Sequence, residues 1–233
     1  MKIREAEGRK KGSGYERLFD NSDLGYLMSK VQATVISNGS ELERIILARS
    51  KQIEDLSVFI DGIETVGQQI YPDGVYICSK RTLRKSKFRS SKRIEPDLLV
   101  FVVSSKKVCH VIELKDGDSF DTKKAAAERA NLERFSKEFG SSVPFTTKFF
   151  ICCFNQLDKT EIFKGFKGKF EMEHIMTGDE LCELLDIDYS EIISMREQDA
   201  QDNIRYFLEE LLKISKVRRI IKDLMNYKLK KCK

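Results

Sequence analysis

The sequence predicts an α/β protein in which a mixed central sheet is flanked by helices. Two apolar runs, at residues 95–103 and 108–115, are separated by a polar turn, which is typical of a β-hairpin. A third apolar run at 149–154 lacks the alternation of a half-solvated strand, and a segment of helical character precedes it. A helix between two strands implies a crossover connection of the kind that joins parallel strands.

Length and composition favour one globular domain with appendages. The chain has 233 residues, of which 41% are hydrophobic and 34% charged, and this is enough for one filled core. Residues 1–14 are rich in Lys, Arg, Gly and Ser and lack apolar periodicity, so we expect a flexible basic arm. Residues 15–233 should form a single domain, with a helical subregion at about 189–233.

Local signals predict two helices and a short strand before the hairpin. Apolar positions from 24 to 35 recur at helical spacing, and the Asn-Gly pair at 38–39 is a typical stop for that helix. Ser40 is then expected to cap a second helix, with Glu43 three residues further on at capping-box spacing. Residues 75–78 are the candidate strand.

The segment after the hairpin is expected to begin as a loop and continue as a helix. Asp121 or Thr122 is a suitable N-cap for this helix, and Gly140 is a suitable end. The small alanines at 125–127 suit close packing on the sheet. The helix therefore leads from the hairpin to the third strand.

Basic side chains are concentrated just before the hairpin. The formal net charge is only +5, but residues 80–93 contain eight cations and no acidic residue. Such a run favours contacts with nucleic-acid phosphates over a merely solvated face. The eight residues are Lys80, Arg81, Arg84, Lys85, Lys87, Arg89, Lys92 and Arg93.

Neither membrane insertion nor secretion is expected. No apolar run approaches the roughly 20 residues that a spanning helix needs, and no secretory signal follows the basic start. The six cysteines show no CxxC spacing and are typical of reduced core thiols. These observations indicate a cytoplasmic protein without a membrane partner.

Carboxylates and an ammonium converge at one end of the expected hairpin. Side chains two apart in a strand share a face, so Glu113 and Lys115 should project together. Asp97, at the start of the preceding strand, would complete the pocket, and the Leu114 carbonyl remains available as a further oxygen ligand. Asp97, Glu113 and Leu114 would suit Mg²⁺. Lys115 would hydrogen-bond an attacking water or stabilise charge on phosphorus, as phosphodiester hydrolysis requires.

Each part of this pattern also has a plain structural explanation. Pro-Asp is a frequent turn, and Glu-x-Lys is ordinary surface sequence. Charged residues that end two apolar runs at the same end of a hairpin nevertheless favour catalysis. For Glu43, the capping box and a place in the metal site are equally good explanations, and Glu41 is the rival on the same helix.

Pro96, Asp97, Glu113 and Lys115 resemble the motif of the PD-(D/E)XK nuclease superfamily, in its E-x-K form. This resemblance implies a restriction-endonuclease-like fold, with the motif on adjacent strands of a mixed sheet and a crossover helix after it. It also implies that Glu43, on the helix before the motif, joins the catalytic residues. Within the superfamily, the chain is most similar to type II restriction endonucleases.

The resemblance therefore implies a Mg²⁺-dependent endonuclease that hydrolyses double-stranded DNA. Such an enzyme would be a prokaryotic homodimer whose two sites cut the two strands, with a companion DNA methyltransferase in the same system. Two alternatives stay open at this point. One is a structure-specific nuclease of DNA repair or recombination, and the other is a non-catalytic DNA-binding protein on the same fold.

Overall fold

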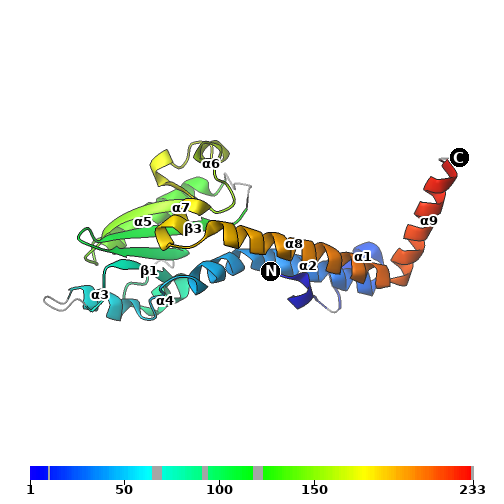
Figure 1. The fold of residues 1–233 in the computed structure, drawn as a ribbon, viewed down its shortest axis with the longest axis horizontal. Helices are drawn as coiled ribbons and strands as arrows, with labels where there is room; N and C mark the ends of the chain where they lie inside the picture. Colours follow the sequence, from blue (N-terminus) through cyan, green and yellow to red (C-terminus); the bar gives the residue numbers. More distant parts are fainter. Residues whose placement is uncertain (10, 65–69, 91–93, 118–122, 232–233) are drawn as a thin grey trace. The chain divides into compact units, whose positions relative to one another are not determined.

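The structure, a computed structural model, describes residues 1–9, 11–64, 70–90, 94–117 and 123–231 (Figure 1). The chain divides into two compact units. The sheet unit comprises Leu42–Tyr189, and the helical unit comprises Met1–Glu41 together with Ser190–Lys233. The division between an N-terminal arm and one following domain stays a prediction.

A five-stranded mixed sheet forms the centre of the sheet unit, as the sequence predicts. Its strands follow one another in the order of the chain. The first three pair antiparallel, and the last three pair parallel. The strands are β1 (Gly74–Ser79), β2 (Leu98–Val103), β3 (Val108–Lys115), β4 (Thr146–Cys153) and β5 (Ile175–Thr177). The predicted hairpin is thus β2 and β3, and the predicted crossover links β3 to β4.

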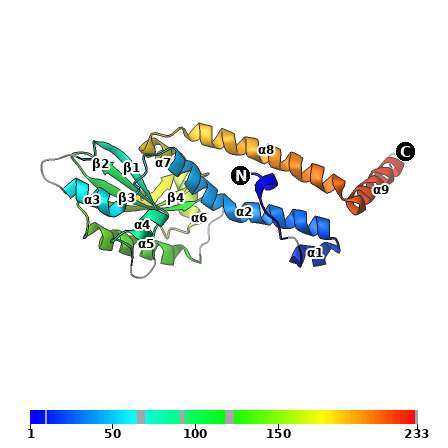
Figure 2. The same ribbon diagram turned by 90° about the horizontal axis from the view of Figure 1, so that it is seen from below.

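Short helices and one longer helix accompany the sheet. The longest helix that lies wholly in this unit, α5 (Ala125–Gly140), provides the crossover and packs against β3 and β4 (Figure 2). The others are α3 (Leu56–Glu64), α4 (Lys80–Lys85), α6 (Lys159–Gly165), α7 (Gly178–Leu185) and the 3₁₀ turn η2 (Met172–His174). The N-cap residues expected for α5, Asp121 and Thr122, lie outside the described residues.

Phenylalanine dominates the core between α5 and the sheet. The Phe101 ring of β2 lies 5.2 Å from Phe59 of α3 and 5.0 Å from Phe145, between ring centroids. Aromatic pairs at such distances add about 0.5–1.5 kcal/mol beyond their buried area. Cys109 and Val111 of β3 belong to the same core. Because side chains alternate along β3, Glu113 and Lys115 lie on the same face of the strand as Cys109 and Val111, at the end of the core.

Helices alone build the helical unit. Besides the 3₁₀ turn η1 (Ile3–Glu5), it contains α1 (Gly14–Phe19), most of α2 (Ser22–Ala48), nearly all of α8 (Tyr189–Lys213) and α9 (Ser215–Lys231). Residues near the N-terminus contact α8, since the Ile3 N–H donates to Asn203 at 2.6 Å. Lys30 of α2 donates to the Tyr206 hydroxyl of α8 at 2.9 Å. The described residues after 189 thus form two helices, α8 and α9.

The predicted break between the first two helices is wrong. The backbone of α2 continues through the Asn-Gly pair at 38–39, and Ser40 lies inside the helix instead of capping it. A glycine inside a helix costs about 1 kcal/mol relative to alanine. Leu42 and Ile46, one turn apart, are both fully buried, and burying each contributes roughly 1.5–3 kcal/mol. Tertiary burial thus outweighs the local stop signal, and Glu43 has no capping box to serve.

Among the described residues, no helix combines the length and apolar character that crossing a membrane requires.

Candidate active site

Strand register brings Asp97 to the end of β3. Leu98 pairs with Ile112, so Asp97 comes immediately beyond the last paired residue of β2. Its Oδ2 accepts a hydrogen bond from the Leu114 N–H at 3.0 Å. The N–H and C=O of one strand residue point to the same strand edge. The Leu114 carbonyl therefore also points to the side of β3 on which Asp97 lies.

Glu113 and Lys115 share one face of β3, as the sequence predicts from alternation. The Lys115 Nζ donates to Glu113 Oε1 at 2.9 Å and to Glu128 Oε1 of α5 at 3.0 Å. All three side chains are 21–31% exposed, so solvent screens the two ion pairs only in part. Lys115 is consequently held between a strand carboxylate and a helix carboxylate.

Lys80 provides a second cation in the same place. It is the first residue of α4, which begins where the Ser79 side chain accepts the Thr82 N–H at 3.1 Å. The Lys80 Nζ donates to Asp97 Oδ1 at 3.0 Å. Both Asp97 oxygens are therefore engaged, one by a main-chain N–H and the other by an ammonium.

Glu43 of α2 is electrostatically coupled to this group. Burial raises the pKa of its carboxyl, the nearby Asp97 raises it further, and Lys80 partly offsets the rise. The buried Leu42 and Ile46 fix the rotation of α2 at this point. The rival residue Glu41 instead forms an ion pair with the Met1 amino group at 2.6 Å. Within the sheet unit, Glu43 is therefore the carboxylate of α2 whose charge Asp97 influences.

The electrostatics of the site favour a divalent cation. Burial raises the pKa of Glu113, and the nearby Asp97 adds to the rise, while Lys115 and Lys80 oppose it. Burial lowers the pKa of Lys115, but Glu113 and Glu128 more than compensate and raise it above its usual value. Carboxylates that destabilise one another's charge gain from a shared metal ion. Asp97, Glu113 and the Leu114 carbonyl are the oxygen donors here that could hold a divalent cation.

A pocket of about 250 Å³ opens at this cluster. Glu113, Glu128 and Lys80 line it together with Arg84 and Pro96. Its polar lining and its place at the end of two strands are suited to a phosphate group with a bound ion. Glu113 of β3, Glu128 of α5 and Lys80 of α4 thus face a common space.

The basic stretch before the hairpin is only partly free for contacts with a ligand. Arg84 forms an ion pair with the buried Glu95 at 3.3 Å, and Lys87 forms one with Asp61 at 2.7 Å. Arg81, Lys85 and Arg89 are exposed. Lys92 and Arg93 lie outside the described residues.

Sequence reasoning missed two members of this cluster. It assigned Lys80 to DNA contacts with the rest of the basic run and gave Glu128 no role. A usable signal exists for Glu128, because it lies four and seven residues before Leu132 and Phe135, two buried residues of α5. A carboxylate on the apolar face of an amphipathic helix needs a partner. For Lys80, we find no comparable signal.

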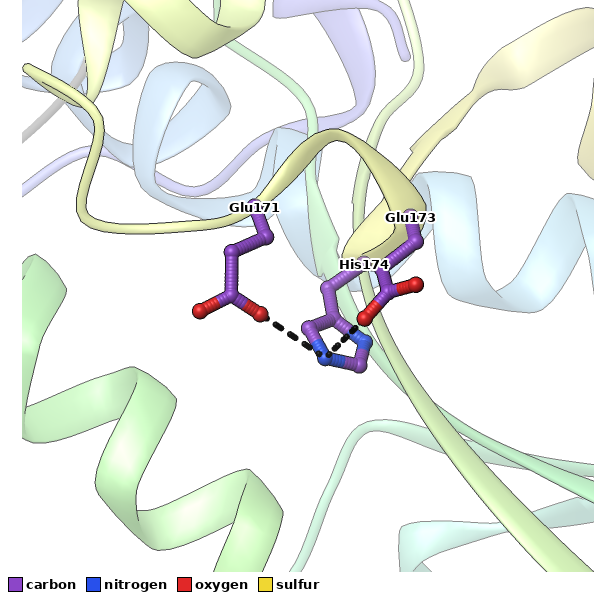
Figure 3. Close-up of side chains that lie close together, drawn as sticks. All are labelled: Glu171, Glu173 and His174. Atoms are coloured by element: carbon purple, nitrogen blue, oxygen red, sulfur yellow. Dashed lines mark ion pairs between the residues drawn. The ribbon is translucent and has the colours of Figure 1, made fainter.

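A second cluster of ligand-type side chains lies at η2 (Figure 3). His174 Nε2 faces Glu171 at 3.5 Å and Glu173 at 3.7 Å, and its Nδ1 lies 3.2 Å from the Phe149 carbonyl. The side chains of Glu171 and Glu173 are 55% and 77% exposed, and Glu171 also pairs with Arg129 at 2.8 Å. We interpret this cluster as surface ion pairing that orients η2.

Comparison with known proteins gives one extensive match. The chain is similar to the type II restriction enzyme HhaII of Haemophilus parahaemolyticus. The two sequences are 52% identical over 224 residues, which cover 95% of this chain and 98% of the relative. No protein-family model and no solved structure matches the chain. Identity at this level, over nearly the whole of both chains, establishes a common family.

Proposed function

The chain belongs to the type II restriction enzymes and is a site-specific deoxyribonuclease. On this premise, we propose that it cuts DNA with a PD-(D/E)XK catalytic site on a restriction-endonuclease-like fold. Asp97, Glu113 and Lys115 are the motif residues, and Glu43 joins them from α2. One observation carries the proposal: at the end of β3, Asp97 accepts the Leu114 N–H and Lys115 donates to Glu113, and Glu113 lines a pocket.

We propose Mg²⁺ as the cofactor, held by Asp97, Glu113 and the Leu114 carbonyl. The ion, when bound, polarises the phosphate and lowers the pKa of a water molecule. Glu43 adds negative charge beside Asp97, which strengthens the attraction for a divalent cation. The fit of this donor set follows from the raised pKa of Glu113 and of Glu43, since both carboxyls gain when a cation lies among them.

Lys115 acts as an ammonium. Its raised pKa keeps the side chain protonated at neutral pH, so it donates hydrogen bonds and is not a general base. A donor at this place orients the attacking water and stabilises the negative charge that develops on the phosphate oxygens. The hydrogen bonds to Glu113 and Glu128 fix the ammonium beforehand.

Double-stranded DNA is the substrate, and the exposed cations Arg81, Lys85 and Arg89 are proposed to contact its phosphates. We also propose a homodimer that brings one site to each strand. Exposed apolar side chains one turn apart on α8, Ile204 and Leu208, offer surface for such an interface. A companion DNA methyltransferase would protect the host sequence.

Substitutions at the motif test the catalytic assignment. Asp97→Asn keeps an oxygen for the Leu114 N–H and removes the charge, and Lys115→Met removes the ammonium. Each should lower the rate of plasmid cleavage in Mg²⁺ by at least about 100-fold. DNA binding without Mg²⁺ and thermal unfolding should stay close to those of the unmodified protein. Lys169→Met, which removes an exposed cation outside the proposed site and DNA contacts, is the matched control for Lys115→Met.

A fully active Lys115→Met protein would refute the assignment. Cofactor dependence needs a separate experiment, in which EDTA removes cleavage and added Mg²⁺ restores it. Sequencing of the product ends then identifies the site that is cut. A protein that cleaves equally well in excess EDTA would contradict the proposed metal site while leaving the family assignment intact.

A further inference from the structure

Glu128 occupies an unusual place for a charged side chain. It lies in the first turn of α5, on the face that buries Leu132 and Phe135 at 4% exposure each. The packing of these two residues fixes the rotation of α5 and directs Glu128 towards the sheet. There its Oε1 accepts a hydrogen bond from Lys115 Nζ at 3.0 Å.

The second acceptor changes where the ammonium lies. Lys115 Nζ is already 2.9 Å from Glu113 Oε1. With Glu113 as its only partner, the ammonium would be attracted solely towards a carboxylate that is proposed to bind the metal, and would compete with a cation there. Glu128 attracts it from the side of α5. A long, flexible side chain with two fixed acceptors also samples fewer rotamers before the reaction.

We propose that Glu128 is a positioning residue, which holds the Lys115 ammonium beside the reacting phosphate and limits its competition for Glu113. The inference rests on the proposed function, because it presumes that Lys115 assists hydrolysis. Glu128 lines the same pocket, but in this proposal it binds neither the phosphate nor the metal. Its effect on the reaction passes through Lys115.

Two substitutions separate charge from shape. Glu128→Gln keeps the size of the side chain and loses the charge, and Glu128→Asp keeps the charge on a shorter side chain. Glu128→Gln should lower kcat for cleavage about 10–100-fold, with KM for DNA unchanged within about threefold. Glu128→Asp should restore part of the lost kcat. The matched control, Glu138→Gln, changes an exposed residue of the same helix and should behave as the unmodified protein.

Three outcomes would overturn the proposal. The first is a Glu128→Gln protein with kcat within twofold of the unmodified enzyme. The second is a rise in KM at constant kcat, which would indicate a DNA contact. The third is a tenfold or larger loss of Mg²⁺ affinity when Glu128→Gln is added to Lys115→Met, measured by calorimetry without DNA, which would make Glu128 a metal ligand. Thermal unfolding of each variant excludes a loss of folded protein as the cause.

A double substitution distinguishes this inference from the proposed function. If Glu128 acts through Lys115, adding Glu128→Gln to Lys115→Met should slow cleavage by less than about twofold beyond Lys115→Met alone. If Glu128→Gln instead lowers the cleavage rate by the same factor in Lys115→Met as in the unmodified protein, Glu128 acts independently of Lys115 and the inference is overturned. If Lys115→Met is fully active, the proposed catalytic site itself fails. If Lys115→Met is inactive and Glu128→Gln is fully active, only the role of Glu128 fails.

Discussion

Lys80→Met should increase the affinity of the DNA-free protein for Mg²⁺. The Lys80 Nζ lies 3.0 Å from Asp97 Oδ1, one of the proposed metal-binding oxygens. A magnesium ion about 2.1 Å from that oxygen would lie within about 5 Å of the ammonium. Repulsion between charges of +2 and +1 at about 5 Å amounts to about 1.7 kcal/mol even at the dielectric constant of water. The ion and Lys80 therefore oppose each other.

The water value is a lower bound, because the Lys80 side chain is only 32% exposed and solvent screens it in part. An energy of this size corresponds to at least about 15-fold tighter binding of Mg²⁺ in Lys80→Met. Isothermal titration calorimetry without DNA measures the change, and thermal unfolding checks that the fold is kept. Lys85→Met removes the same charge from an exposed position of the same helix and should change the affinity by less than about twofold. Unchanged or weaker Mg²⁺ binding in Lys80→Met would refute the reasoning.

Three further predictions concern stability and assembly. Burial and the nearby Lys148 lower the pKa of His110 from 6.5 to about 4. Between these two pH values, the unfolded chain binds more protons than the folded protein. The free energy of unfolding therefore falls as the pH falls from about 6.5 to about 4. His110→Phe should therefore lose less stability than the unmodified protein between about pH 6.5 and about pH 4, and parallel melting curves would contradict this. Gly178→Ala should lower the free energy of unfolding by about 1–3 kcal/mol or more, because a Cβ there would lie 2.1 Å from the Phe154 carbonyl oxygen. Denaturant titration measures this change, and an unchanged free energy of unfolding would contradict the prediction. Leu208→Glu should convert the proposed homodimer to a monomer in light scattering, and an unchanged mass would exclude this surface from the interface.

The hairpin and the motif residues on it were predictable because their signals are local. Strand alternation depends only on neighbouring residues, and it is sufficient to put Glu113 and Lys115 on one face of β3. The turn at 104–107 then returns the chain antiparallel, and Asp97 comes to lie at the end of β3. Sequence reasoning succeeded where the decisive contacts join residues close in the chain.

The remaining parts of the site depend on tertiary packing. The sequence supports a metal-site role and a capping role for Glu43 equally, because the Asn-Gly pair before it signals the end of a helix. In the structure α2 continues through this pair, since the burial of Leu42 outweighs the local signal. Lys80 belongs to a run of similar cations, and no local pattern indicates which of them turns towards Asp97. Glu128 follows a segment that the sequence predicts as a loop, so its register relative to β3 could not be derived from spacing alone.

The contact between Asp97 and Leu114 also indicates the order in which parts of the site form during folding. The two residues are 17 positions apart and belong to one hairpin, and hairpins form in about 1–10 μs. Glu128 reaches this place only when α5 packs on the sheet, and Glu43 only when the end of α2 from Leu42 onwards joins the sheet unit. Both steps require longer-range contacts, and the first includes a parallel crossover. The central charges should therefore meet early in folding, while the complete site forms late. A chain emerging from synthesis would acquire its power to cut DNA as one of its last folding events.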